Sequence, residues 1–290
     1  NYQGGKGDVL ADISKACTEH DMDMGLYLSP WDIHDESYGY KDASGKALVE
    51  FVDTNNDGKP DKNQPVNGLT WEQVKQQDAK DYNNYNDQLI EILGNDKYGN
   101  KGHFKEVWMD GAKGSGAGYQ EYDFKKWFDT IQQYEGIAGN QVDDCMLFGA
   151  EAYTTVRWIG NENGFAAEET WSKSNVDKEK NTINSNSSGG YTKGFPDGNQ
   201  WTVPEADARI TSGWFWGDSK KTPKTMEELS EMYFRSVGHN APLLLNVPPN
   251  NKGKVDDAIL RRVTEFGTAI NKTFEKNLAK DAEVSATEVR

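Results

Sequence analysis

The sequence predicts an α/β protein built on a parallel sheet, and three observations lead to this fold class. Short apolar segments alternate along the chain with amphipathic helical segments. The apolar segments are nearly continuous, as expected for strands that are buried on both faces. The chain has 290 residues, a length at which (β/α) barrels are common. We therefore expect a (β/α)8-type TIM barrel. A doubly wound sheet is the second choice, because no Gly-x-Gly-x-x-Gly motif follows a strand.

The helices are predicted from capping residues and from apolar positions that recur with a period of 3.6. Asp8 caps the first, with Val9, Ile13 and Cys17 on its apolar face. Thr70 starts the second, which runs to the segment 89–94. The later helices begin at Asp123, Thr225 and Asp256. The strands are expected at residues 25–29, 106–110, 146–148, 157–159, 208–210 and 243–247.

This count falls short of a full barrel. The chain starts on a helix, so an eight-stranded barrel would lack its first strands here. We therefore expect residues 1–276 to form an N-terminally incomplete barrel within a longer protein. Residues 277–290 change from a helical to a strand-like pattern. They are expected to be a linker or the start of a following β-rich module, such as a β-sandwich.

Two stretches resemble insertions. Residues 172–200 are rich in Ser, Asn, Gly and Lys and are expected to form a long loop, either a mobile rim or a lid. Residues 53–64 match the start of a calcium loop, with oxygen ligands at positions one, three, five and nine and Gly58 at position six. These ligands are Asp53, Asn55, Asp57 and Asp61. Position twelve is Gln64 instead of a bidentate Glu, so a turn-rich surface loop remains the alternative to bound Ca²⁺.

The charge and composition exclude some classes of partner. The chain carries 32 Lys and Arg against 47 Asp and Glu, a net charge of −15, so nucleic acid is not expected as a partner. No apolar run approaches the roughly 20 residues that a membrane span needs. The 9 Trp and 13 Tyr are compatible with a carbohydrate site or with an aromatic core.

Two carboxylates are the candidates for catalysis. Asp110 ends an apolar strand and precedes Gly111; a helix cap is the competing role, but Asp123 already fills it. Glu162 lies in a loop just after the strand at 157–159, and Glu168 and Glu169 are its rivals. Hydrolysis of a glycosidic bond needs two carboxyl groups, ~5–5.5 Å apart for retention and ~6.5–9.5 Å apart for inversion. No histidine pattern, P-loop or Gly-x-Ser-x-Gly motif indicates other chemistry, so no cofactor is expected for catalysis.

Six segments together resemble the α-L-fucosidases of glycoside hydrolase family 29. They are residues 25–32, 85–89, 106–111, 157–162, 213–216 and 236–249, and they occur in the family's order. The Ser-Pro-Trp-Asp sequence that ends at Asp32 and the Arg-Trp-Ile-Gly-Asn-Glu sequence that ends at Glu162 resemble the subgroup that acts on α-1,3- and α-1,4-linked branch fucose. The resemblance implies a retaining mechanism on a barrel that is often followed by a β-sandwich.

The resemblance also implies roles for individual residues. Asp110 matches the nucleophile and Glu162 the acid/base; Trp108 matches an aromatic lining the fucose pocket, Tyr27 a sugar-contacting tyrosine, and Trp214 a residue near the fucose methyl group. The expected sugar-binding set further includes Trp31, His34, Arg157 and Trp158, although His34 is equally explained as part of a solvated loop.

The sequence departs from the family at its front. The family's paired-histidine segment, which holds the fucose hydroxyls, would precede Asn1, which puts activity of this chain alone in doubt. The expected substrate is a fucosylated oligosaccharide or glycoprotein glycan, and the expected location is secreted or cell-surface in a bacterium. The alternatives are another retaining exo-glycosidase or a non-catalytic glycan-binding domain.

Overall fold

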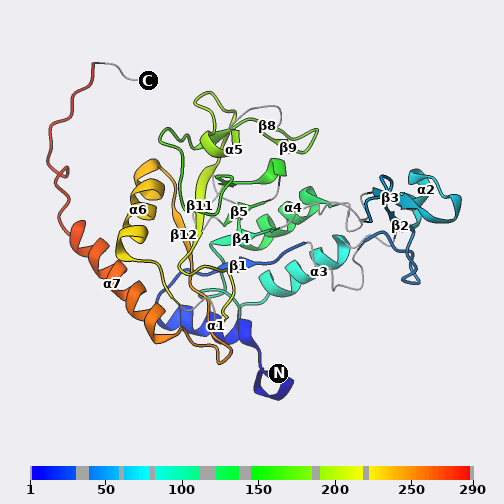
Figure 1. Cartoon of the computed structure of the whole chain (residues 1–290), viewed down its shortest axis with the longest axis horizontal. Helices are drawn as coiled ribbons and strands as arrows, with labels where there is room; N and C mark the ends of the chain where they lie inside the picture. Colours follow the sequence, from blue (N-terminus) through cyan, green and yellow to red (C-terminus); the bar gives the residue numbers. More distant parts are fainter. Residues whose placement is uncertain are drawn as a thin grey trace. The chain divides into compact units, whose positions relative to one another are not determined.

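The computed structural model describes most of the chain, and its path is drawn in Figure 1. The described residues are 2–30, 39–58, 62–78, 82–110, 122–136, 145–149, 151–184, 190–217 and 222–287. The chain divides into two compact units. Unit 1 consists of residues 1–157, 173–190 and 195–203, and unit 2 of residues 158–172, 191–194 and 204–290.

The main sheet has six strands in the order β1-β4-β5-β6-β11-β12. Their bounds are Gly25–Tyr27, Glu106–Trp108, Met146–Phe148, Val156–Trp158, Val203–Arg209 and Leu243–Asn246. β1 pairs in parallel with β4, β4 with β5, β5 with β6, and β11 with β12. Parallel strands that neighbour one another in chain order, with α-helices after β1, β4 and β11, are the arrangement of part of a (β/α) barrel. The α/β class and the six predicted strands are confirmed, and β11 begins five residues earlier than expected.

Helices α1, α2, α4, α6 and α7 begin directly after the residues predicted to cap them. The α-helices are α1 Val9–Glu19, α2 Trp71–Gln77, α3 Tyr82–Leu93, α4 Phe124–Glu135, α5 Gly190–Lys193, α6 Met226–Ser236 and α7 Asp257–Thr273. Short 3-10 turns cover Tyr2–Gly5, Val66–Gly68, Glu151–Tyr153 and Val237–His239. The side chains of Asp8 and Asp123 accept N-cap hydrogen bonds, and Thr70 and Thr225 form capping boxes. The described residues after α7 contain no strand, so the following β-rich module stays a prediction.

Two helix predictions were wrong in detail. The single helix expected from Thr70 to the segment 89–94 is two helices, α2 and α3. On α1, Val9 and Ile13 are about half exposed, while Ser14 is buried and Leu10 packs against the core; Cys17 packs against the core as predicted. The Ser14 hydroxyl donates to the carbonyl oxygen of Leu10 at 2.7 Å, which allows a polar side chain on the buried face.

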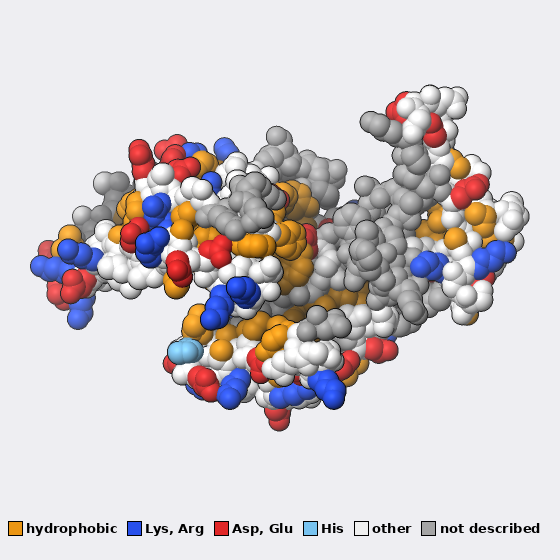
Figure 2. All heavy atoms as spheres, turned by 60° about the horizontal axis from the view of Figure 1, so that its bottom comes forward, with side chains coloured by type: hydrophobic (Ala, Val, Ile, Leu, Met, Phe, Trp, Pro, Cys, Tyr) orange, Lys and Arg blue, Asp and Glu red, His pale blue; other side chains and the backbone are white. Residues whose placement is uncertain are grey.

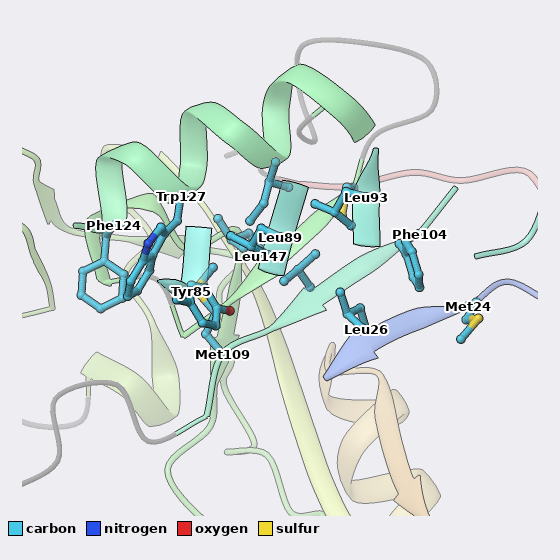
Figure 3. Close-up of a cluster of buried hydrophobic side chains, with 13 residues drawn as sticks. Met24, Leu26, Tyr85, Leu89, Leu93, Phe104, Met109, Phe124, Trp127 and Leu147 are labelled. Carbon is cyan, nitrogen blue, oxygen red and sulfur yellow. The ribbon is translucent and has the colours of Figure 1, made fainter. Parts of the chain in front are cut away.

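The core of unit 1 lies between the strands β1, β4 and β5 and the helices α3 and α4. Leu26, Val107 and Leu147 come from the strands, and Leu89 and Trp127 come from the helices. Figure 3 shows labelled members of this cluster, with Tyr85, Leu89, Met109 and Leu147 at the centre of the view. Trp127 is fully buried, so truncating it to Ala would cost about 3–5 kcal/mol. The core of unit 2 joins β11 to α6 and α7 through Ala208, Ile210, Leu229, Met232 and Ile259.

The stretch 172–200 is not the structureless loop that its composition suggested. It contains β7 Lys173–Ser174, β8 Val176–Asp177, β9 Thr182–Ile183, α5 and the start of β10 Gln200–Trp201. β7 pairs with β10, and β8 pairs with β9, in both cases antiparallel. Hydrogen bonds between buried polar side chains replace apolar packing: the hydroxyls of Ser174 and Thr202 lie 2.7 Å apart, and Asn184 donates to Ser174 at 3.2 Å.

The predicted calcium loop joins β2 Val49–Val52 to β3 Lys62–Pro65, which pair antiparallel. Tyr40, Leu48 and Val74 form a small core of their own beside this hairpin.

The charge on the surface and the length and polarity of the helices are relevant to the expected partners. On the face shown in Figure 2, Lys and Arg side chains lie interspersed with Asp and Glu side chains. In the described parts of the chain, each helix is too short or too polar to cross a membrane.

Candidate active site

Three aromatic side chains form a row at the carboxyl ends of β1, β4 and β5 in unit 1. Tyr27 is the register partner of Trp108, and Trp108 is the partner of Phe148. Neighbouring parallel strands lie ~4.8 Å apart, so side chains in register lie face to face. The rings of Tyr27 and Trp108 stack at 5.4 Å and 19°, and those of Trp108 and Phe148 at 3.9 Å and 9°. Tyr27, Trp108 and Phe148 are called the aromatic row below.

Asp110 lies two residues beyond the aromatic row. The Tyr27 hydroxyl donates to Asp110 Oδ2 at 2.5 Å, and the Ser29 hydroxyl donates to the backbone carbonyl of Asp110 at 2.8 Å. Partial burial and the hydrogen bond to Asp110 raise the pKa of the Tyr27 hydroxyl, so Tyr27 keeps its proton and is the donor at neutral pH. Asp110 itself is exposed, at the edge of the sheet where barrel enzymes carry their catalytic groups.

Gly149 allows β5 to end close to β4 at this edge. Its φ is +77°, and a Cβ atom placed on it would collide with the carbonyl oxygen of Met109. Any other residue would therefore push apart the strand ends that carry Phe148 and Asp110.

Glu162 has its own set of partners within unit 2. Trp214 Nε1 donates to Glu162 Oε2 at 3.2 Å, and Arg209 Nη2 lies 4.0 Å from the same oxygen. The Arg209 guanidinium also lies over the Trp214 ring, 5.3 Å from its centroid. Asn246, the register partner of Arg209, donates from Nδ2 to the Trp214 carbonyl at 2.8 Å. The ends of β11 and β12 therefore hold the indole that binds the Glu162 carboxylate.

The rivals of Glu162 have different surroundings. Glu168 and Glu169 are both exposed, and Glu169 accepts a hydrogen bond from Trp171 Nε1 at 3.2 Å. Glu162 is the carboxylate that the contacts described for unit 2 bring together with Trp214 and Arg209.

The remaining predicted sugar-binding residues differ in exposure. Arg157 is 1% exposed, and burial lowers the pKa of its guanidinium to about 10, which leaves it cationic at neutral pH. Trp158 is 38% exposed and donates from Nε1 to the buried carboxylate of Asp207 at 2.7 Å. Trp31 and His34 lie outside the described residues.

Sequence reasoning missed Ser29, Phe148 and Arg209. Phe148 ends its strand as Trp108 does, so aligning the strand ends would have found it. Arg209 was placed inside a predicted apolar strand, where a cation is the signal of a functional position. Ser29 begins the Ser-Pro-Trp-Asp sequence noted above, but its hydrogen bond joins it to a residue 81 positions away, a contact for which the sequence contains no signal.

In the loop expected to bind calcium, side-chain oxygen atoms accept hydrogen bonds from backbone amides of the same loop. The Asp57 amide donates to Asn55 Oδ1 at 2.9 Å, and the Gly58 amide donates to Asp53 Oδ2 at 2.8 Å. Asp61 lies outside the described residues. Across the residues that the structure describes, no group of three or more His, Cys, Asp and Glu side chains is arranged to hold a metal ion. The oxygen-only donors are nonetheless of the type that Ca²⁺ takes.

Comparison with known proteins places the chain in a family. The family model described as Alpha-L-fucosidase matches residues 1–275. The chain is 34% identical over 290 residues to Alpha-L-fucosidase 1 of Arabidopsis thaliana, a match that covers 100% of this chain and 47% of the plant protein. Its structure is similar to that of a Ruminococcus gnavus GH29 fucosidase in complex with fucose, with a TM-score of 0.80 and 67% identity over 96% of this chain and 50% of that chain. The chain thus spans about half the length of these relatives. The chain belongs to the α-L-fucosidase family, glycoside hydrolase family 29.

Proposed function

We propose that this protein is a retaining, exo-acting α-L-fucosidase in which Asp110 is the nucleophile. The observation that carries the proposal is the carboxylate of Asp110 at a strand end, held by the Tyr27 hydroxyl at 2.5 Å beside the aromatic row. An aromatic face suits the C–H face of a sugar ring, and a nearby fixed carboxylate suits attack on its anomeric carbon. The Ruminococcus gnavus relative, whose structure contains fucose, supports the choice of sugar.

The reaction follows a double displacement. Asp110 Oδ attacks the anomeric carbon of fucose while Glu162 gives its proton to the glycosidic oxygen, and the bond to the leaving group breaks. Glu162, now a carboxylate, takes a proton from water, and the resulting oxygen displaces Asp110 and releases fucose. This mechanism requires the two carboxyl groups to lie ~5–5.5 Å apart. Trp214 and Arg209 orient the Glu162 carboxyl group in both steps.

We propose α-1,3- and α-1,4-linked branch fucose, as in Lewis-type antennae, as the substrate. Support comes from the Ser-Pro-Trp-Asp sequence that ends at Asp32 and the Arg-Trp-Ile-Gly-Asn-Glu sequence that ends at Glu162. We propose a secreted or cell-surface location in a bacterium, because such glycans are presented outside cells.

The test is hydrolysis of an aryl α-L-fucoside and of a Lewis-type trisaccharide by the full-length protein and its Asp110→Ala variant. We expect both cleavages to be lost in the variant, and added azide to restore cleavage of the aryl substrate with formation of a β-fucosyl azide. Cleavage of an aryl galactoside or hexosaminide in place of the fucoside would indicate another exo-glycosidase. Glycan binding without any hydrolysis by the unmodified protein would indicate a glycan-binding domain.

We also propose that the loop from Asp53 to Asp61 binds Ca²⁺ as a structural ion and that catalysis uses no cofactor. The support is the spacing of Asp53, Asn55, Asp57 and Asp61 around a glycine turn. Added Ca²⁺ should raise the Tm of the protein, and this rise should disappear in Asp57→Ala. If neither Ca²⁺ nor a chelator changed the Tm, the segment would be a surface loop that binds no structural ion.

A further inference from the structure

Phe215 follows Trp214 directly and is 84% exposed. A Phe side chain gains ~1.5–3 kcal/mol on full burial, so its exposure is a cost that the folded chain bears. Exposure of one apolar residue on a mobile loop would carry no functional meaning. The question is therefore whether the loop holds Phe215 in a defined place.

Hydrogen bonds hold this loop on both sides of Phe215, all of them within unit 2. Before it, Thr211 Oγ1 donates to the Gly213 carbonyl at 3.1 Å, and Asn246 Nδ2 donates to the Trp214 carbonyl at 2.8 Å. After it, Trp216 Nε1 donates to Asp256 Oδ2 at 2.8 Å. Asp256 is itself held by a 2.7 Å hydrogen bond from Asn250. The exposed ring is thus presented from a fixed backbone.

The loop also connects Phe215 to the proposed acid/base. Its preceding residue, Trp214, donates to Glu162 Oε2 at 3.2 Å. A second exposed aromatic approaches the Glu162 loop: Tyr191 is 46% exposed, and a methyl group built on Gly160 would lie 4.0 Å from Tyr191 Cβ. Gly160 is two residues before Glu162, so two exposed aromatic side chains are associated with the loop that carries this carboxylate.

We propose that Phe215 and Tyr191 form a binding site for the leaving group, taking the apolar face of the neutral pyranose ring to which fucose is attached. The inference deepens the proposed function and rests on it. An acid that protonates the glycosidic oxygen must lie next to the first sugar of the leaving group. Pyranose rings present C–H faces that aromatic rings cover, and a ring carried on a fixed backbone needs no ordering of the loop on binding. These contacts would select substrates by the leaving group, separately from recognition of fucose.

The test compares two substrates that carry the same fucose and need the same protonation. Methyl α-L-fucoside has a leaving group without a ring, and a Lewis-type trisaccharide has a disaccharide leaving group. We expect Phe215→Ala to lower kcat/KM about tenfold for the trisaccharide and to leave it unchanged for the methyl fucoside. Tyr191→Ala should act in the same direction. Phe234→Ala, which removes a 51% exposed ring on α6, is the matched control and should affect neither substrate.

Two results would overturn the proposal. An equal loss for both substrates would mean that Phe215 acts by positioning Glu162, and no loss for either would mean that its ring touches no leaving group. Because both substrates depend on Glu162, a disturbed acid/base cannot mimic the expected difference.

A binding measurement separates this inference from the proposed activity. The disaccharide that the trisaccharide releases is titrated into the full-length protein and into Phe215→Ala. Weaker binding by the variant would support the leaving-group site even if the unmodified protein hydrolyses neither substrate. Equal binding by the two proteins would overturn it.

Discussion

Replacing Tyr27 with Phe removes one hydroxyl from the site and keeps the ring. The hydroxyl donates to Asp110 Oδ2 at 2.5 Å, whereas the ring stacks on Trp108 at 5.4 Å. The aromatic row should therefore survive the change, while the Asp110 carboxylate loses the donor that orients it. The substitution separates the hydrogen bond from the packing.

The size of the effect follows from the hydrogen bond and its exposure. A hydrogen bond to a charged group contributes ~1.5–3 kcal/mol, and water competes for this one because Tyr27 is 60% exposed. We take the lower end of this range, about 1.5 kcal/mol, which corresponds to a rate lower by roughly tenfold. We expect kcat for an aryl α-L-fucoside to fall about tenfold, with KM nearly unchanged because the variant keeps the ring for which we expect a contact with the sugar.

A matched control is available elsewhere on the chain. The Tyr2 hydroxyl donates to Asp12 Oδ2 at 2.6 Å, and Tyr2 is 49% exposed. Tyr2→Phe removes the same kind of hydrogen bond away from the proposed nucleophile and should leave kcat unchanged. If Tyr27→Phe and Tyr2→Phe were equally active, Tyr27 would not orient Asp110, and the reasoning would be refuted.

Two further predictions concern stability. Burial raises the pKa of the Glu135 carboxyl, which accepts the Phe104 amide at 3.1 Å. The folded state therefore favours the protonated form, and its stabilisation is lost as the pH rises through the raised pKa. Glu135→Gln keeps an acceptor for this amide but carries no titrating group. The free energy of unfolding of this variant, measured with urea, should therefore increase relative to that of the unmodified protein as the pH rises from below 4.5 to neutral. A difference in unfolding free energy between the two proteins that stays the same at every pH would contradict this prediction. Asn184→Ala removes the buried side chain that accepts from the Asn175 amide at 2.9 Å and donates to Ser174, at a cost of about 2–4 kcal/mol. Asn199→Ala, whose bonds are exposed, should cost about 1 kcal/mol, and equal losses in urea unfolding would count against a polar core.

Local features of the fold were predictable because each depends on neighbouring residues. The capping boxes at Thr70 and Thr225 were confirmed, since the residues three positions later close them. The strands were confirmed because short apolar runs that alternate with amphipathic helical segments favour a parallel sheet.

Predictions that required a long-range partner were less accurate. On α1 a 3.6-residue period fits two faces, one with Val9 and Ile13 and the other with Leu10 and Ser14. Only packing against the rest of unit 1 decides which face is buried. The stretch 172–200 appeared structureless because its stabilising contacts are hydrogen bonds between polar side chains. Asn184 and Ser174 are 10 residues apart in the sequence, and composition does not reveal the hydrogen bond between them.

The sequence by itself determined which carboxylates to consider. Asp110 and Glu162 follow apolar strands, and parallel strands bring their carboxyl ends to one edge of a sheet. Only the tertiary structure decided what surrounds each of them. Strand register set Phe148 beside Trp108 and Asn246 beside Arg209, and folding brought Tyr27 to Asp110 across 83 positions and Trp214 to Glu162 across 52. A side chain's own environment depends on distances of a few ångströms between segments far apart in the chain, and register and packing, not local propensity, establish those distances.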